Sequence, residues 1–260
     1  MSLTNKTLAN TYKDILQMDN SNSGIDTNAR IIKDGEGTAS CLSLSDDLVS
    51  IRPNNDDTTS TFLVRSNGGT ILLSVDTTNS KVSALGNYVN TQYAHFGLSA
   101  SGSTSFLANT HYTIPFSSNA LTSEEMPFGT GTDPATTFTT SEGTATRAGE
   151  LVPMLWYVPD AISIDGITSI EGADTATGDT TRMQLFRYTF TSGATNCLTS
   201  GTLLAHNSDV TTAGSEQPYL STWTVDSAAV TAGKVILAFF RSDSVNSDYG
   251  INIKVKYHLT

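Results

Sequence analysis

The chain has 260 residues, a formal net charge of −11 and only 15% charged residues. Serine, threonine, asparagine and glycine are frequent, which favours a turn-rich, mainly β protein over a helical one. The longest unbroken apolar run covers residues 235–240, far short of the roughly 20 residues that cross a bilayer. The sequence therefore predicts no membrane-spanning helix and no membrane insertion.

The negative charge is concentrated in the second part of the chain, since residues 101–260 carry fifteen acidic and seven basic side chains. Such a surface repels phosphate groups, so the sequence lacks the basic footprint of a nucleic-acid-binding protein. The same sign gives no attraction to anionic lipids. A glycan ligand would have to be held by hydrogen bonds and aromatic stacking.

Residues 4–18 form the one segment with helical periodicity. Leu8, Tyr12, Ile15 and Leu16 recur at helical spacing, after polar residues that can cap a helix. Two interpretations remain open: a surface helix packed on its own chain, or a helix that contacts other copies or another protein. The N-terminus has no apolar segment of a secretory signal, which predicts synthesis in the cytoplasm.

Residues 60–86 predict three short strands joined by tight turns, at 61–65, 70–75 and 81–85. In the middle strand Ile71, Leu73 and Val75 fall on one face at period two, which is typical of a half-buried strand. The breaks are rich in the turn-forming residues Asn, Gly, Asp and Thr.

This three-stranded segment is too thin to fold alone, because each strand offers only two or three inward apolar side chains. Ordering a residue costs roughly 1–2 kcal/mol, while burying an aliphatic side chain returns only about 1.5–3 kcal/mol. The segment therefore needs partners, either from the downstream domain or from identical chains.

Residues 73–86, LSVDTTNSKVSALG, are similar to a unit that recurs in the shafts of tailed-bacteriophage fibre and tailspike proteins. The shared features are a Val-Asp pair, a polar turn, a basic residue before valine, and a final glycine. A looser copy lies at 39–51, and residues 5–35 resemble the leader of virion fibre proteins from marine phages.

The resemblance implies a homotrimer that is made in the host cytoplasm, becomes part of a virion, and attaches to other virion proteins through its N-terminal part. It also implies that the β shafts of three chains intertwine and cover one another's apolar faces. The residues expected at the trimer interface are Leu8, Tyr12, Ile15, Ile71, Leu73, Val75, Val82 and Leu85.

The second part of the chain predicts a β-sandwich. Strands are expected at 106–116, 151–158, 161–170, 181–190, 202–206, 219–225, 234–241 and 251–260. Their fairly even spacing favours two packed sheets, most naturally a jelly roll. The expected domains are an N-terminal helix and attachment leader at 1–30, a short intertwined β shaft at 31–100, and a jelly-roll-like sandwich head at 101–260.

The sequence contains no recognisable catalytic motif. Its four histidines lack metal-ligand spacing, and no nucleophile elbow, phosphate loop or dinucleotide fingerprint occurs. His206 precedes Asn207, Ser208 and Asp209, but side chains that adjacent cannot converge on one reacting atom. Acids that remain open as a glycosidase pair are Asp160, Asp165, Glu171, Asp174 and Asp243. We expect no enzyme, no cofactor and no metal site.

Tyr219 and Trp223 are the candidate receptor-binding residues, because rings at the edge of a loop can stack on sugars. A core position is the alternative for both. We expect a structural fibre protein of a phage virion whose head recognises a host-surface glycan or protein. The alternatives are a capsid decoration or capsid fibre protein that stabilises or ornaments the shell, a glycan-degrading tailspike enzyme, and a free-standing carbohydrate-binding module.

Overall fold

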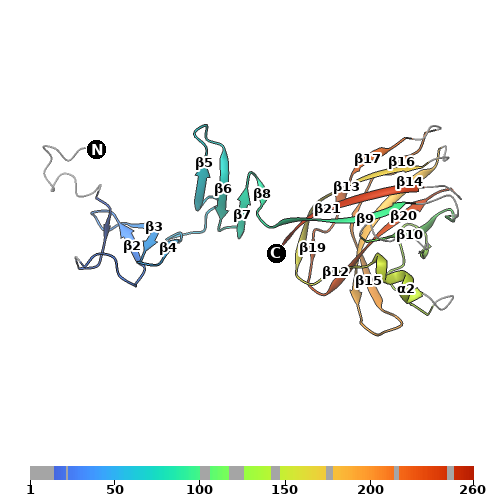
Figure 1. The fold of residues 1–260 in the computed structure, drawn as a ribbon, viewed down its shortest axis with the longest axis horizontal. Coiled ribbons are helices and arrows are strands. Elements are labelled where there is room, and N and C mark those ends of the chain that lie inside the picture. Colours follow the sequence, from blue (N-terminus) through green and yellow to red (C-terminus); the bar gives the residue numbers. More distant parts are fainter. Residues whose placement is uncertain are drawn as a thin grey trace. The chain divides into compact units, whose positions relative to one another are not determined.

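The computed structural model describes residues 15–21, 23–99, 106–116, 126–141, 147–173, 178–213, 217–244 and 249–260. The chain divides into two compact units, Met1–Val89 and Asn90–Thr260, which are treated separately below (Figure 1). We call them the N-terminal unit and the C-terminal unit. Both are built mainly of antiparallel strands, which confirms the mainly β fold class.

The N-terminal unit holds two four-stranded sheets in which successive strands pair. The first contains β1 (Gln17–Met18), β2 (Arg30–Lys33), β3 (Ala39–Leu44) and β4 (Val49–Ile51). The second contains β5 (Phe62–Arg65), β6 (Ile71–Asp76), β7 (Lys81–Ala84) and β8 (Asn87–Tyr88). The three predicted strands are confirmed as β5, β6 and β7. Their turns follow the expected chemistry, since Gly69 has a φ of +87° and the Asn79 N–H donates to Asp76 Oδ1 at 2.9 Å.

Each of these sheets has an apolar face and a more polar face. Directly opposite residues on paired antiparallel strands share a face. In the second sheet the apolar rows are Phe62, Val75 and Val82, then Val64, Leu73 and Ala84. Its other face carries Leu63, Ser74, Ser83 and Tyr88. The first sheet repeats part of this design with Leu42 opposite Ile51, Leu44 opposite Val49, and Ser43 opposite Ser50, while Arg30 lies opposite Leu44 at the edge of the apolar face.

Within the N-terminal unit, the described residues leave both of these faces uncovered. Among the described residues of the N-terminal unit, no side chain is buried. The large apolar side chains that remain exposed there are Leu16, Ile25, Ile31, Leu48, Val49, Ile51, Phe62, Val64, Ile71, Leu72, Val82, Leu85 and Val89. The strands of this unit therefore pair with one another, but their apolar side chains lack the burial that normally stabilises a sheet.

The helix expected over residues 4–18 is wrong for its last part. Residues 15–18 contain no helix, and Gln17 and Met18 instead pair with Lys33 and Ile32 as strand β1. A short, lightly apolar helix is marginal, and pairing with β2 satisfies the same backbone groups. Residues 4–14, with Leu8 and Tyr12, lie outside the described residues.

The C-terminal unit is a jelly roll of two antiparallel sheets. Its main strands are β9 (Thr91–Ser99), β10 (Thr110–Ile114), β13 (Ile162–Ala173), β14 (Thr180–Phe190), β15 (Leu198–His206), β17 (Tyr219–Thr222), β20 (Lys234–Ser242) and β21 (Tyr249–Leu259). One sheet has the order β9-β21-β13-β17, and the other contains β10-β20-β14-β15. Apart from β14 and β15, main strands that follow one another along the chain lie in opposite sheets. This alternation gives the strand order of a jelly roll. The predicted jelly-roll sandwich is confirmed.

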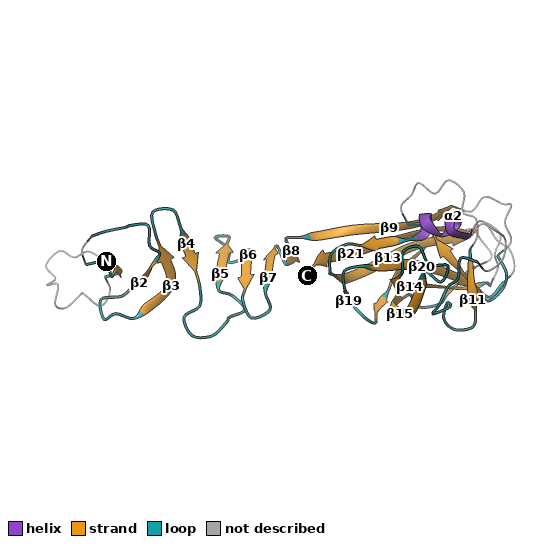
Figure 2. Cartoon of the chain, turned by 90° about the horizontal axis from the view of Figure 1, so that it is seen from below, coloured by secondary structure: helices purple, strands orange, loops and turns teal. Residues whose placement is uncertain are grey.

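Shorter elements complete this unit. β11 (Pro127–Thr130), β12 (Trp156–Val158), β16 (Val210–Thr211) and β18 (Thr224–Val225) extend the eight-stranded sheet, and β19 (Ala229–Val230) joins the five-stranded sheet. The helix α2 (Arg147–Leu151) and a 3-10 turn (Val152–Met154) precede β12; Figure 2 shows α2 in purple. Within the described part of the chain, no helix has the length and apolarity needed to cross a membrane.

The main core lies between the two sheets. Alternate side chains of the five-stranded sheet point inward from β9, β13 and β21 and meet those of β10, β14 and β20. Representative members are Phe96, Ile167, Met183, Phe240 and Ile253, each at most 2% exposed. This core fixes which side chains of the five-stranded sheet face outward.

A second core covers the outer face of the eight-stranded sheet. There Phe186, Tyr188 and Phe239 of β14 and β20 pack against Phe128 and Phe138 from the segment around β11. The strands β14 and β20 are consequently buried on both faces. The outer face of the five-stranded sheet has no equivalent cover among the described residues.

Three expected boundaries differ from those in the structure. The unit boundary lies between Val89 and Asn90 rather than near residue 100, because β9 pairs with β21 over nine residues and buries Ala94, Phe96 and Leu98. The leader expected at 1–30 also does not stand apart, since β1 pairs with β2. The strand expected at 151–158 is reduced to Trp156–Val158, because Pro153 lacks an N–H and lies in the 3-10 turn.

Candidate functional site

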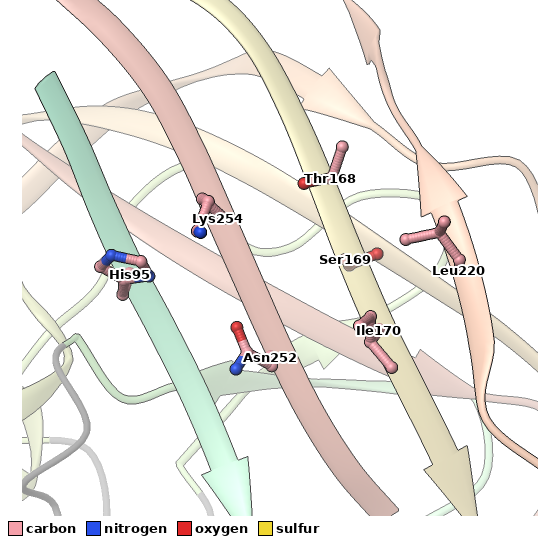
Figure 3. A pocket seen from close by; sticks show the side chains of 7 residues that line it. All are labelled: His95, Thr168, Ser169, Ile170, Leu220, Asn252 and Lys254. Carbon is pink, nitrogen blue, oxygen red and sulfur yellow. The ribbon is translucent and has the colours of Figure 1, made fainter. Parts of the chain in front are cut away.

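The candidate site is a shallow hollow on the outer face of the five-stranded sheet in the C-terminal unit. It has a volume of about 290 Å³ and is lined by His95, Thr168, Ser169, Ile170, Leu220, Asn252 and Lys254 (Figure 3). These residues come from β9, β13, β17 and β21, which are far apart in the sequence and adjacent in the sheet. Figure 3 shows the side chains of His95, Asn252 and Lys254 above the ribbon of their strands.

The strand register arranges the lining residues in two rows. In the first row, His95 lies opposite Lys254, and Lys254 lies opposite Thr168. This row supplies an imidazole, an ammonium group and a hydroxyl group. All three side chains are exposed, because the neighbouring residues along each strand point into the core.

The second row is more apolar. Asn252 lies opposite Ile170, and Ile170 lies opposite Leu220. Ile170 is 51% exposed and Leu220 is 74% exposed. Gly97 stands opposite Asn252 at the other end of the row and has no side chain to fill the space above the sheet. The hollow therefore combines polar groups in one row with an apolar wall in the next.

The charge of this outer face is opposite to that of the chain. The described residues of β9, β13, β17 and β21 include two carboxylates, Asp165 and Glu171. Asp165 Oδ1 lies 2.9 Å from Nδ1 of His258, and Glu171 is buried. Lys254 of β21 faces outward in the hollow. Lys254 Nζ also lies 5.6 Å from the ring centre of Tyr93, which is 55% exposed.

The layer beneath the hollow is tightly held. The indole N–H of Trp223 donates to Ser169 Oγ at 2.8 Å, and Trp223 is only 5% exposed. Glu171 Oε2 accepts a 2.8 Å hydrogen bond from the Thr181 hydroxyl. Burial raises the pKa of Glu171, and that hydrogen bond opposes the rise. A rigid floor of this kind keeps the two rows of outward side chains in register.

Neither of the two candidate receptor-binding residues lines the hollow. Trp223 follows β17 at the point where the chain passes to β18 in the opposite sheet, so its ring belongs to the core. The Tyr219 hydroxyl accepts a 2.9 Å hydrogen bond from the Ala213 N–H, and its side chain is half-buried. Trp223 therefore occupies the core position that the sequence left open as the alternative to a binding role.

The acidic and histidine candidates have separate partners. His206 Nδ1 lies 2.8 Å from Asp226 Oδ2, whereas Asp209 accepts a 2.6 Å bond from Arg182 Nε. Residues 206–209 thus do not converge on one point. Asp243 accepts a 2.7 Å bond from the Thr180 N–H, Asp160 is exposed, and Asp174 lies outside the described residues. In the described part of the chain, no three His, Cys, Asp or Glu side chains group as metal ligands.

The expected interface residues of the N-terminal unit lie on its strands and turns. Ile71, Val82 and Leu85 are exposed, while Leu73 and Val75 are half-buried. A bulge opposite Arg65 places Leu72 as an extra residue between Ile71 and Leu73. Leu73 and Val75 lie on one face, as expected. Ile71 is separated from them by the bulge, so the alternation expected for all three residues is interrupted there. Ile15 is half-buried and not helical.

Comparisons with known proteins give no family. No protein-family model and no curated protein matches the sequence. Among solved structures, the chain is similar to the crystal structure of an aminopeptidase from the marine sediment archaeon Thaumarchaeota archaeon, with 9% sequence identity and a TM-score of 0.29. The match covers 72% of this chain and 38% of that chain. A likeness this distant carries no argument about fold or function.

The sequence identified none of the hollow's residues as a site. The alternation at 251–259 predicts that Asn252 and Lys254 face solvent, and the alternation of Ala94, Phe96 and Leu98 is a signal for β9 that leaves His95 outward. Which strands lie side by side is set by the jelly-roll topology. Alternation within one strand carries no information about it.

Proposed function

We propose that this chain is the subunit of a homotrimeric structural fibre of a phage virion. The N-terminal unit forms a short shaft with its counterparts in the other two chains, and the C-terminal unit is a head that meets the host surface. The observation that carries the proposal is the pair of uncovered apolar faces in the N-terminal unit.

These faces are ordered in a way that suits identical partners. Phe62, Val75 and Val82 form one row of three opposed residues, and the next row is equally apolar. Burying one aliphatic side chain is worth about 1.5–3 kcal/mol. Closing the exposed positions Phe62, Val64 and Val82 against two other copies would supply stabilisation that the lone four-stranded sheet lacks.

Exposed apolar faces of this extent in a single chain favour association over an isolated module, which would need its apolar side chains inside. The tandem arrangement also supports a shaft, because the first sheet repeats part of the design of the second with Leu42, Leu44, Val49 and Ile51. The number three rests on the resemblance of residues 73–86 to phage shaft repeats.

The C-terminal unit supports the role of a head. It has its own core between two sheets and a second core on the eight-stranded sheet, so its fold does not depend on the apolar faces of the N-terminal unit. A jelly roll is a common scaffold of viral and lectin domains. Fold alone does not define function, so the role as a head also depends on the surface of this unit.

Native mass in solution tests the proposal. Sedimentation equilibrium or native mass spectrometry of the full chain should give three times the chain mass of 27.6 kDa. A single-chain mass at micromolar concentration would refute the shaft. Electron microscopy of virions labelled with an antibody against the C-terminal unit then tests placement, and a label on the tail or the capsid would also decide between a tail fibre and a capsid fibre.

A further inference from the structure

From the hollow of the outer face we infer that the head binds a carboxylated sugar unit of a surface polysaccharide. The inference deepens the proposed function, because it rests on the role of the C-terminal unit as the part that meets the host. The ligand class is an acidic pyranose, such as a uronic acid, within a chain of sugars.

The outer face of the five-stranded sheet differs from the other outer face of the jelly roll. The eight-stranded sheet is covered by Phe128, Phe138 and their neighbours from the same chain. On the five-stranded sheet, Tyr93, Ile170 and Leu220 remain exposed. Exposed aromatic and aliphatic side chains beside polar ones are typical of binding surfaces.

Charge indicates an anionic occupant. Lys254 faces outward in the hollow, and the outward carboxylate of the four strands, Asp165, lies 2.9 Å from Nδ1 of His258 and not in the hollow. A second copy docked through the same face would bring Lys254 and Lys256 against their own counterparts, which is unfavourable. A carboxylate in the hollow instead complements the ammonium group of Lys254.

The two rows of the hollow match the two sides of a sugar acid. In the first row, Lys254 can donate to a carboxylate that Thr168 also reaches, and His95 adds a further polar group. In the second row, the amide of Asn252 can both donate to and accept from hydroxyl groups. Ile170 and Leu220 offer an apolar wall to the C–H face of the ring. A free inorganic anion would use the first row and leave this wall without a role.

The size of the hollow agrees with one sugar unit. Its volume of about 290 Å³ lies at the lower limit of pockets for small molecules, which span roughly 300–1,000 Å³. An open hollow lets the neighbouring units of a polysaccharide continue along the sheet. Three heads on one fibre would then strengthen a weak single contact by effective concentration.

The test uses the full-length chain and measures binding of a β-linked glucuronic acid tetrasaccharide by calorimetry at low salt, with the matching glucose tetrasaccharide as the neutral probe. We expect the acidic probe to bind at least about tenfold more tightly, since hydrogen bonds to charged groups are worth roughly 1.5–3 kcal/mol. Lys254→Gln should remove about this tenfold preference. Lys256→Gln makes the same charge change on the same face outside the hollow, and it should alter the affinity no more than about twofold.

Several results would overturn the inference. These are equal affinity for the two tetrasaccharides, an unchanged preference in Lys254→Gln, equal effects of the two lysine variants, or no binding of either probe. A tetraglutamate peptide that binds as tightly as the acidic sugar would also overturn it, because the site would then recognise carboxylates without the ring. Thr168 and Lys254 are exposed, so thermal melting should show both Lys254→Gln and a second variant, Thr168→Ala, to be folded.

The native mass of the same samples separates this inference from the fibre. A trimer that ignores the acidic probe refutes the site and leaves the fibre standing. A monomer that binds the probe through Lys254 refutes the fibre and leaves the site standing.

Discussion

Val75 lies directly opposite Val82 across β6 and β7, and the described residues of the chain leave Val82 39% exposed. In the adjacent pair of this antiparallel ladder, Ser74 lies opposite Ser83, with their hydroxyl oxygens 3.5 Å apart. The two pairs mark the opposite faces of the same small sheet. The contrast between them gives a direct test of which face would meet another copy in the proposed trimer.

If the proposed trimer forms, we predict that Val82→Asp dissociates it and that Ser83→Asp does not. A charge on the apolar face would have to be buried without a partner, in addition to the loss of roughly 1.5–3 kcal/mol of apolar burial per chain. Sedimentation velocity at micromolar concentration should show single chains for Val82→Asp and the wild-type mass for Ser83→Asp. If Val82→Asp keeps the wild-type mass while Ser83→Asp loses it, the opposite face carries the contact.

We predict that even a methyl side chain at Gly201 of β15 destabilises the C-terminal unit. A Cβ at this position would lie 2.6 Å from Cε1 of the buried Tyr188 ring and 3.1 Å from the Cα of Thr136. Overpacking of a filled core costs about 1–3 kcal/mol, so Gly201→Ala should lower the free energy of unfolding by that amount in urea denaturation. Gly166→Ala is the matched control, because its Cβ would meet nothing within 4 Å. Equal stability of the two variants would show that Tyr188 can move aside.

Much of the fold was predictable because local pattern and final environment agree. The strands at 181–190, 234–241 and 251–260 were expected from alternation or from apolar runs, and they appear as β14, β20 and β21. The segment 219–225 was expected as one strand. It divides at Trp223 because the chain there leaves one sheet for the other, a change that no residue pattern encodes.

Other features depend on contacts that the sequence does not display. β9 was not among the expected strands although Ala94, Phe96 and Leu98 alternate, because residues 31–100 were assigned to the shaft. The hollow joins His95 to Lys254, which are 159 positions apart and become neighbours only through the register of β9 and β21. Apolarity at 151–158 was misleading, since Pro153 in a 3-10 turn leaves only the last three residues as a strand.

We predict that His111 makes the C-terminal unit less stable in mild acid. Burial lowers the pKa of His111 below its ordinary value, and the charges of Arg241 and Arg182 add to this, against the hydrogen bond to the Gly131 carbonyl. The unfolded chain therefore takes up a proton at a pH where the folded one does not. The stability that depends on neutral His111 is fully present above its unfolded pKa of about 6.5. It is lost as the pH falls through the lower pKa of His111 in the folded chain.

The measurement for His111 is urea denaturation between pH 8 and pH 5. His111→Gln retains a donor for Gly131 and does not titrate, so its loss of stability over this range should be smaller than that of the wild type. Identical pH profiles for the two proteins would assign the acid sensitivity to other groups.

Trp223 is predicted to act through stability. Trp223→Phe removes the donor to Ser169 Oγ and leaves that buried hydroxyl without its 2.8 Å partner, which should cost about 1–3 kcal/mol. Removing both partners leaves neither unsatisfied, so Ser169→Ala combined with Trp223→Phe should cost less than the sum of the single variants. Additive costs would show that the hydrogen bond contributes little. A stable Trp223→Phe with lost glycan binding would restore the receptor role.

The last strand is predicted to be indispensable to the C-terminal unit. β21 lies between β9 and β13 and pairs with both along nearly its whole length, so both neighbours depend on it for their backbone hydrogen bonds. Its inward residues Ile251, Ile253 and Val255 also belong to the main core. A chain that ends at Tyr249 would lose the ladders with β9 and β13 and the inward side chains that β21 contributes to the core. The free energy lost with them exceeds the 5–15 kcal/mol that typically stabilises a domain. We expect it to show no cooperative thermal transition for this unit by calorimetry. Deleting Thr260 alone spares β21 and should preserve that transition; a chain ending at Tyr249 that still melts cooperatively would mean that β9 and β13 can close the sheet without it.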